Sequence, residues 1–284
     1  MKTVAGRVLM RTLGSSPLAA RLFPFKQPPV LLLSYPRSGS SWVGSILGRS
    51  PDLAYLREPI NQPFIMRTSH RTVWDPDADP GDRDLYQDLA KRAFAGVPPM
   101  EDPHVVLDPR DFLLLHRRRG RRLLVKEVNP LAIEFFLRTW DLQVIPLLRH
   151  PGAVAESYVR MGWHSGDLTE FGRLYGERMA RVVEAVRPTG ASPILYEDLA
   201  ADPHDGFLAL FDRMGVRAPE DYTRLIQRLC QAEGDPSSPY DIRRTSALEI
   251  HKWRDGLGVE AVQALRAGYF DSPLQHYRRP EDWP

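Results

Sequence analysis

The sequence is poor in cysteine, in lysine and in net charge. Its 284 residues include one cysteine, Cys230, and five lysines among 38 basic residues, which nearly balance 36 acidic ones. A single thiol excludes an intramolecular disulfide framework and a clustered-thiol metal site, and it fits a reducing compartment best. A formal charge of +2 gives no general reason to expect nucleic acid or a membrane as partner. We therefore expect a cytoplasmic protein that binds no nucleic acid.

Long apolar runs and metal-ligand spacings are also missing. Basic residues interrupt the N-terminal 25 residues, so no stretch is long enough for a signal-peptide core or a membrane span. We expect residues 1–27 to form an arm that packs on its own domain, a reading favoured over contact with a membrane. His-x-x-His spacings and cysteine clusters do not occur, so no metal site is predicted.

What is present is an apolar segment, then a turn, then a helix. Residues 30–35 (VLLLSY) show no polar alternation, which is typical of a parallel strand buried on both faces. The loop 36–41 follows at once, and apolar residues at helical spacing over 42–49 predict a helix that Ser50-Pro51 ends.

A second copy of this arrangement runs from a strand at 142–148 across Arg149-His150-Pro151 into a helix at 152–161. Pro146 inside this strand argues against a central place in the sheet, because proline cannot donate to a strand ladder. Two further short apolar runs, at 123–126 and 192–196, also precede helical periodicity.

Strands that alternate with helices predict a three-layer α/β fold, with a mainly parallel sheet flanked by helices, in one domain over 1–284. Residues 67–110 are rich in Asp and Pro and predict insertion loops around a helix at 85–94, where we expect the acceptor to bind. A Pro- and Ser-rich connector at 235–240 precedes a helical stretch near Ala247. The arginine run at 117–122 is interpreted as a solvated turn, with attraction of an acidic substrate as the alternative.

The loop PRSGSSW, at residues 36–42, carries the strongest chemical signal. Its Gly39 bend and its hydroxyls at Ser38, Ser40 and Ser41 would direct several donors to the positive end of a helix, which suits a phosphate or a sulfate. The spacing of a Walker A loop is absent, which removes the main support for ATP and Mg²⁺. The alternative is a tight structural turn with Ser40 as the helix N-cap.

YPRSGSSW resembles the 5′-phosphosulfate loop of the sulfotransferases, which use 3′-phosphoadenosine 5′-phosphosulfate (PAPS) as donor and release PAP. This resemblance implies a P-loop nucleotide-kinase-like fold and no metal. Arg149 and Ser157 match the Arg and the Ser, eight residues apart, that hold the donor's 3′-phosphate in that family. Tyr196 opens a Y-E-D-L segment that in relatives lies on a late strand near the adenine, and Lys252 falls in a weaker match to the C-terminal basic loop.

The resemblance is closer to carbohydrate sulfotransferases and their bacterial relatives than to the cytosolic phenol and steroid enzymes. The latter typically carry Lys at the position of Arg37 and a catalytic His two residues after the position of Lys126, where this chain has Val128. The resemblance implies that Arg37, Ser38, Gly39, Ser40, Ser41 and Trp42 hold the phosphosulfate.

Sulfuryl transfer requires cations on the moving group and on the leaving oxygen, together with a base for the acceptor hydroxyl. Arg37 and Lys126 are the candidate cations, and Glu58 in the R-E-P element is the candidate base, because relatives without the His use a Glu near this position. The alternative for Glu58 is an ion pair with Arg57 or Arg37.

His70 and His104 are the reserve bases. Trp74, Trp140 and Trp163 could stack on an acceptor, although core packing is the commoner role of a tryptophan. The acceptor itself is a small hydroxyl compound, which could be a sugar, a glycolipid or a secondary metabolite, and the sequence carries no signal for oligomeric state. A P-loop-like small-molecule kinase or nucleotide hydrolase, or an inactive nucleotide-binding relative, are the alternative functions.

Overall fold

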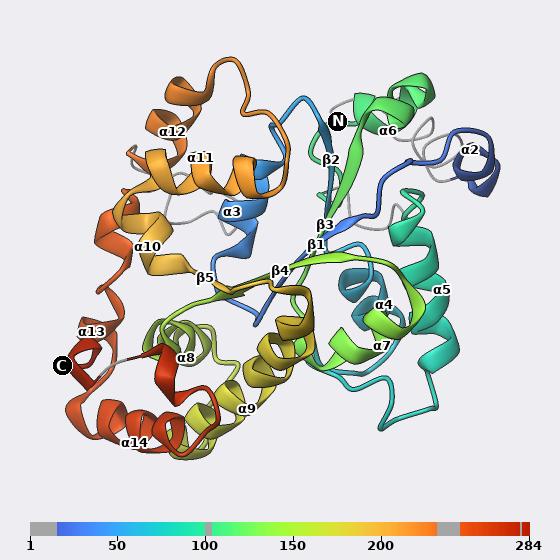
Figure 1. Cartoon of the computed structure of the whole chain (residues 1–284). Helices are drawn as coiled ribbons and strands as arrows, with labels where there is room; N and C mark the ends of the chain where they lie inside the picture. Colours follow the sequence, from blue (N-terminus) through green and yellow to red (C-terminus); the bar gives the residue numbers. More distant parts are fainter. Residues whose placement is uncertain (1–15, 100–103, 232–244, 279) are drawn as a thin grey trace.

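The computed structural model describes residues 16–99, 104–231, 245–278 and 280–284. Its centre is a five-stranded parallel sheet in the order β2-β3-β1-β4-β5 (Figure 1). The strands are β1 (Val30–Ser34), β2 (Leu53–Arg57), β3 (Arg122–Glu127), β4 (Gln143–Leu148) and β5 (Ile194–Leu195). All residues of β1 are buried, as its uninterrupted apolar sequence predicts.

Helices cover both faces of the sheet, and the sheet separates the core into two apolar clusters. Leu31 and Leu33 of β1 face one apolar cluster, whereas Val30 and Leu32 face the other. The first cluster is completed by α4 (Asn61–Arg67), α5 (Arg83–Phe94), α7 (Ile133–Thr139), α8 (Pro151–Arg160), α9 (Leu168–Val186) and α14 (Val259–Phe270). The second contains α3 (Ser40–Leu47), α10 (Tyr196–Ala201), α11 (Pro203–Arg213) and α12 (Tyr222–Cys230). The predicted three-layer arrangement is therefore confirmed.

Shorter elements complete the described chain. They are α2 (Pro17–Leu22), α6 (Arg110–Leu113) and α13 (Trp253–Gly256), with 3-10 turns at Leu115–Gly120, Pro130–Ala132, Arg187–Thr189, Ser246–Glu249, Gln275–Tyr277 and Pro280–Asp282. The helix predicted at 85–94 is α5, and its buried face packs into the first cluster. The connector expected at 235–240 and most of the N-terminal arm lie outside the described residues.

Two expectations and one detail of an alternative were wrong. β4 is an inner strand despite Pro146, because β5 pairs with Leu147 and Leu148 alone and the ladder on that side begins after the proline. Tyr196 begins helix α10 and is not a strand residue; Glu197 and Asp198 in its first turn favour the helix through the macrodipole. Gly39, not Ser40, is the N-cap of α3.

The arginine run is also not a simple solvated turn. Arg118 is fully buried, and its guanidinium donates to the carbonyl oxygens of Gly96 (3.1 Å) and Phe112 (3.4 Å). Arg121 forms an ion pair with Asp111. Arg118 and Arg121 thus hold the segment against its own core, whereas Arg117 and Arg119 are exposed as a solvated turn predicts.

Candidate functional site

The loop between β1 and α3 adopts an unusual backbone. Arg37 (φ 70°) and Gly39 (φ 82°) both lie in the left-handed region, which costs free energy for a residue with a Cβ. A Cβ on Gly39 would lie 2.4 Å from a ring carbon of Tyr196, so this position requires glycine. Left-handed residues alternating with right-handed ones create a concave row of N–H groups, which suits an anion.

The serines of this loop differ in their hydrogen bonding. Ser34 donates its hydroxyl to that of Ser40 (2.8 Å), below the first turn of α3. The Ser38 hydroxyl is buried and has no hydrogen-bond partner among the described residues. Because buried polar groups are normally paired, this orphan fits the oxygen of a bound anion. Trp42 is fully buried, with its ring centroid 5.4 Å from that of Tyr196, and so supports the loop from behind.

The second motif contacts the first directly. The Arg149 guanidinium donates to the Arg37 carbonyl oxygen (3.0 Å), and Arg37 Nε donates to the Ser157 hydroxyl (2.9 Å). Arg149 also lies over the Tyr196 ring, with its Cζ 4.4 Å from the centroid, and its Nε is buried without a partner in the described chain. The structure therefore brings together Arg37, Arg149, Ser157 and Tyr196, which are spread over 160 residues of sequence.

The backbone at Arg149 is held from behind. Tyr175 donates its hydroxyl to the Arg149 carbonyl oxygen (2.6 Å), and the next amide, of His150, donates to Glu197 (2.8 Å). Glu197 also forms an ion pair with the buried Arg278 (2.5 Å). Tyr175 and Arg278 were not predicted from the sequence, because their contacts near the end of β4 depend on the tertiary fold.

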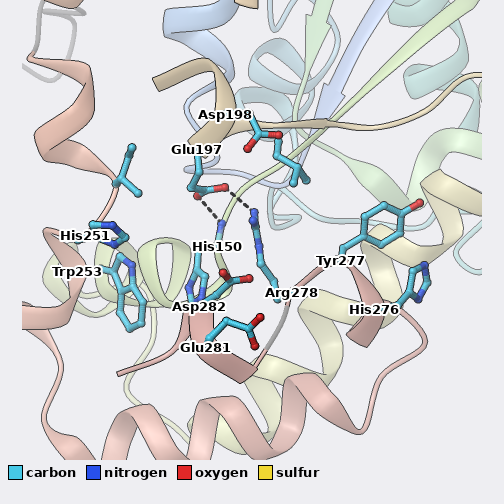
Figure 2. A pocket seen from close by; sticks show the side chains of 12 residues that line it. His150, Glu197, Asp198, His251, Trp253, His276, Tyr277, Arg278, Glu281 and Asp282 are labelled. Carbon is cyan, nitrogen blue, oxygen red and sulfur yellow. Dashed lines mark hydrogen bonds and ion pairs between the residues drawn. The ribbon is translucent and has the colours of Figure 1, made fainter. Parts of the chain in front are cut away.

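Figure 2 shows a pocket that His150, Glu197 and Arg278 help to line; its volume is about 470 Å³. The His150 ring lies between Trp253 and Trp283, with both centroid distances 4.5 Å. Burial, together with nearby arginines, lowers the pKa of His150 well below its ordinary value, so the ring is neutral and accepts the Gly152 amide at the start of α8. Four carboxylates, from Glu197, Asp198, Glu281 and Asp282, line the pocket. Arg278 also lines it and pairs with Glu197, so the remaining acidic side chains disfavour a polyanionic donor. The anion site is therefore better assigned to the loop.

Glu58 and Lys126 form an ion pair at the carboxyl edge of the sheet. Glu58 follows β2 with φ 49°, and its amide donates to the Lys126 carbonyl oxygen (2.7 Å). The Lys126 side chain is 2% exposed and that of Glu58 is 13% exposed. Burial alone would raise the pKa of Glu58, but Lys126 and a hydrogen bond from Gln62 outweigh it and hold the pKa below its ordinary value. The alternative supposed that Glu58 pairs with Arg57 or Arg37, but its ion-pair partner is Lys126.

Parallel pairing explains how these groups meet. Lys126 lies opposite Leu32 of β1 and Arg57 of β2, so its neighbours in the sheet lead into the loop on one side and into Glu58 on the other. The carboxyl ends of parallel strands share one edge, where open α/β sheets bind their ligands.

Glu127 is a further residue at this edge that the sequence analysis did not assign. It is fully buried, and its Oε1 accepts the amides of Ile60 (2.7 Å) and Asn61 (3.4 Å), at the start of α4. Burial, followed by the charge of Glu58, raises the pKa of Glu127 to about 8. An acidic residue directly after Lys126, at the end of an apolar strand, was the available signal.

The replacement Glu127→Gln is expected to flatten the dependence of stability on pH. A carboxyl whose pKa rises from 4.5 to about 8 on folding stabilises the protein fully below pH 4.5, and this contribution is lost as pH rises through 8. Glutamine keeps an acceptor for Ile60 without the charge. Thermal unfolding at pH 5, 7 and 9 should show a smaller fall in Tm for Glu127→Gln than for the wild type. Glu170→Gln, on the exposed face of α9, is the control, and parallel Tm curves for all three proteins would contradict this expectation.

Other predicted residues lie away from this cluster. The Lys252 side chain is 73% exposed, and its Nζ lies 3.4 Å from Glu249 Oε1. Its role at the 3′-phosphate stays a prediction. His70 stacks on Phe64 and contacts Asp82 (2.9 Å), which is a structural arrangement. His104 is exposed. Trp74 is buried and Trp140 packs against Phe94, whereas Trp163 is 54% exposed.

The described residues show neither a metal-binding cluster nor a membrane-spanning helix. They contain no group of three or more His, Cys, Asp or Glu side chains placed to hold a metal ion. No helix in the same part of the chain has the length and apolar character needed to cross a membrane.

The known proteins that resemble this chain in sequence or in structure are sulfotransferases. A family model described as the sulfotransferase family matches residues 28–220. Carbohydrate sulfotransferase 4 of Mus musculus is 23% identical over 303 residues, covering 84% of this chain and 78% of its own. The sulfotransferase domain from the curacin biosynthetic pathway superposes with a TM-score of 0.50 at 17% identity, covering 87% of this chain and 99% of that domain. At this identity the superposition shows a shared fold, which confirms the predicted fold class.

Proposed function

Because the chain belongs to the sulfotransferase family, we propose that it transfers the sulfuryl group of PAPS to a hydroxyl of a small acceptor. The contact of Arg37 with both Ser157 and Arg149 is the observation that carries this proposal. It links a loop suited to a phosphosulfate with an arginine suited to a second phosphate. A doubly anionic nucleotide therefore matches the arrangement better than a compound with one anionic group.

The residues present fit such a donor. The unpaired Ser38 hydroxyl and Arg149 Nε are groups that anionic oxygens would satisfy. The donor supplies an activated sulfuryl group and a leaving phosphate. We assign Ser38, Gly39, Ser40 and Ser41 to the phosphosulfate, Arg149 and Ser157 to the 3′-phosphate, and Tyr196 to the adenine side. Trp42 acts as their buried support.

Arg37 acts as an electrostatic clamp on the sulfuryl oxygens, because a guanidinium does not readily release a proton. Lys126 stabilises the charge that develops on the leaving oxygen. Glu58, ionised beside Lys126, accepts the proton of the acceptor hydroxyl. A carbohydrate relative favours a sugar hydroxyl as the acceptor, and a cytoplasmic location stays a prediction.

Labelled PAPS incubated with the protein and fractionated host extract tests the function. Mass spectrometry should find an acceptor heavier by about 80 Da, the mass of one sulfuryl group, with PAP released in equal amount. Thermal shift with PAP should exceed that with ATP and Mg²⁺. Preference for ATP would favour the kinase alternative, and PAP binding without transfer to any fraction would favour the inactive relative.

The replacement Arg149→Ala is expected to weaken PAP binding about 10- to 100-fold, the loss of one hydrogen-bonded charge pair. Calorimetric titration should show the Kd of adenosine 5′-monophosphate, which lacks the 3′-phosphate, changing less than about threefold. Arg187→Ala, at an exposed pair on the surface, is the control. Equal losses for the two nucleotides would refute the 3′-phosphate assignment.

A further inference from the structure

The chain after Ser157 leaves apolar side chains at the surface. Val159, Met161 and Trp163 are 42%, 41% and 54% exposed. Helix α8 ends at Arg160, and Gly162, with φ 67°, turns the chain so that the Trp163 amide donates to the Tyr158 carbonyl oxygen (2.9 Å). A tryptophan more than half exposed on so short a turn requires an explanation, because tryptophan is usually well covered.

The Trp163 ring is held firmly although it is exposed. It packs edge-on against Tyr158, with centroids 5.6 Å apart, and Tyr158 packs against Phe171 (5.2 Å). Phe171 belongs to the buried core. This row of rings fixes the orientation of the indole, which therefore presents a flat and rigid surface.

The same indole lies beside one of the assigned catalytic residues. The Arg37 guanidinium carbon is 5.7 Å from the Trp163 ring centroid, while Arg37 Nε is bound to Ser157. Transfer requires the acceptor oxygen within about 3–3.5 Å of the sulfur and in line with the leaving group. If Arg37 holds the sulfuryl oxygens, the body of the acceptor must lie close to Trp163.

On the basis of the proposed function, we propose that Trp163 is the stacking platform for the acceptor and that the acceptor is a pyranose. One face of such a ring carries C–H groups that pack on an indole, and its edge carries the hydroxyls that must point toward Arg37. A rigid indole favours a compact ring with a C–H face over an extended alkyl alcohol, because a flexible chain loses more conformational entropy when it is fixed on a flat surface.

The test compares Trp163→Ala and Trp163→Phe with Val259→Ala, an even more exposed apolar residue on α14. The acceptors are methyl β-galactoside, methyl N-acetyl-β-glucosaminide and hexan-1-ol, with PAPS as donor. Trp163→Ala should raise KM for the better glycoside about tenfold or more, leave the Kd of PAP within about threefold, and change kcat little. Trp163→Phe should recover most of the loss, and Val259→Ala should behave as wild type. Titration with the glycoside should change the indole fluorescence of the wild type but not of Trp163→Phe.

Hexan-1-ol as the preferred acceptor, or an unchanged KM in Trp163→Ala, would overturn the assignment. Faster hydrolysis of PAPS in Trp163→Ala with an unchanged KM would also overturn it, because the indole would then serve only to exclude water. These outcomes are distinct from failure of the function itself, in which the wild type transfers sulfuryl to no compound in any host fraction.

Discussion

Replacement of Arg37 by methionine is expected to lower kcat by about 10²–10³-fold, the usual cost of removing one preorganised donor to developing charge. Methionine keeps the unbranched stem of the side chain and carries no charge. Because we assign the 3′-phosphate to Arg149, PAP should still bind the variant. Transfer from PAPS at saturating acceptor measures the effect.

Two further variants sharpen this experiment. Arg37→Lys keeps the charge but cannot reproduce the planar guanidinium beside Ser157 and Trp163, so its kcat should fall between those of the wild type and the methionine variant. Arg160→Met, at an exposed pair on the same helix as Ser157, controls for the loss of a positive charge nearby. Turnover of Arg37→Met within about threefold of wild type would disprove the clamp role.

The replacement Glu58→Gln is expected to lower turnover by about 10² or more while PAP binding persists. An amide of the same shape keeps a hydrogen-bond acceptor for Lys126 and cannot take a proton from the acceptor hydroxyl. Loss of the buried ion pair also destabilises the fold, so Tm is measured with and without PAP. A variant that remains folded with PAP and turns over almost normally would eliminate Glu58 as the base, and Glu170→Gln is the matched surface control.

The decline of kcat/KM at low pH provides a second test of the same base. A base must be ionised to act, and Lys126 keeps the pKa of Glu58 below its ordinary value of 4.5 despite burial. Activity should therefore persist as pH falls and decline only below about 4.5. An imidazole base of ordinary pKa, about 6.5, would instead produce a decline near neutral pH. In the Glu58→Gln variant, this decline of kcat/KM at low pH should disappear.

Local sequence was a good guide to the central part of the fold. The apolar segments at 30–35, 123–126 and 142–148 lie within or next to β1, β3 and β4, because a strand buried on both faces needs an uninterrupted apolar run. β2 was missed: it is a short edge strand in which Tyr55 and Arg57 weaken the apolar signal.

The contacts within the site were less predictable than its members. Arg37 binds Ser157 because β1, which precedes Arg37, pairs with β4, which precedes the helix of Ser157. No local sequence pattern reveals this order of strands. For the same reason, neighbouring charges in sequence suggested Arg57 as a partner for Glu58, whereas pairing of β2 with β3 placed Lys126 there. Arg118 was misjudged because a cluster of arginines resembles a surface turn until the carbonyl groups that satisfy one of them are known.

The position of β1 in the sheet also has a consequence for synthesis of the protein. Val30 pairs with Leu124 on one side and with Gln143 on the other, so both sheet neighbours of the strand that leads into the loop come from residues after 120. Contacts so distant in sequence close slowly, because the intervening chain must first be ordered. A nascent chain that stops before β4 exposes an apolar strand edge, which favours aggregation. We therefore expect chains that end before β4 to aggregate more readily than the full chain.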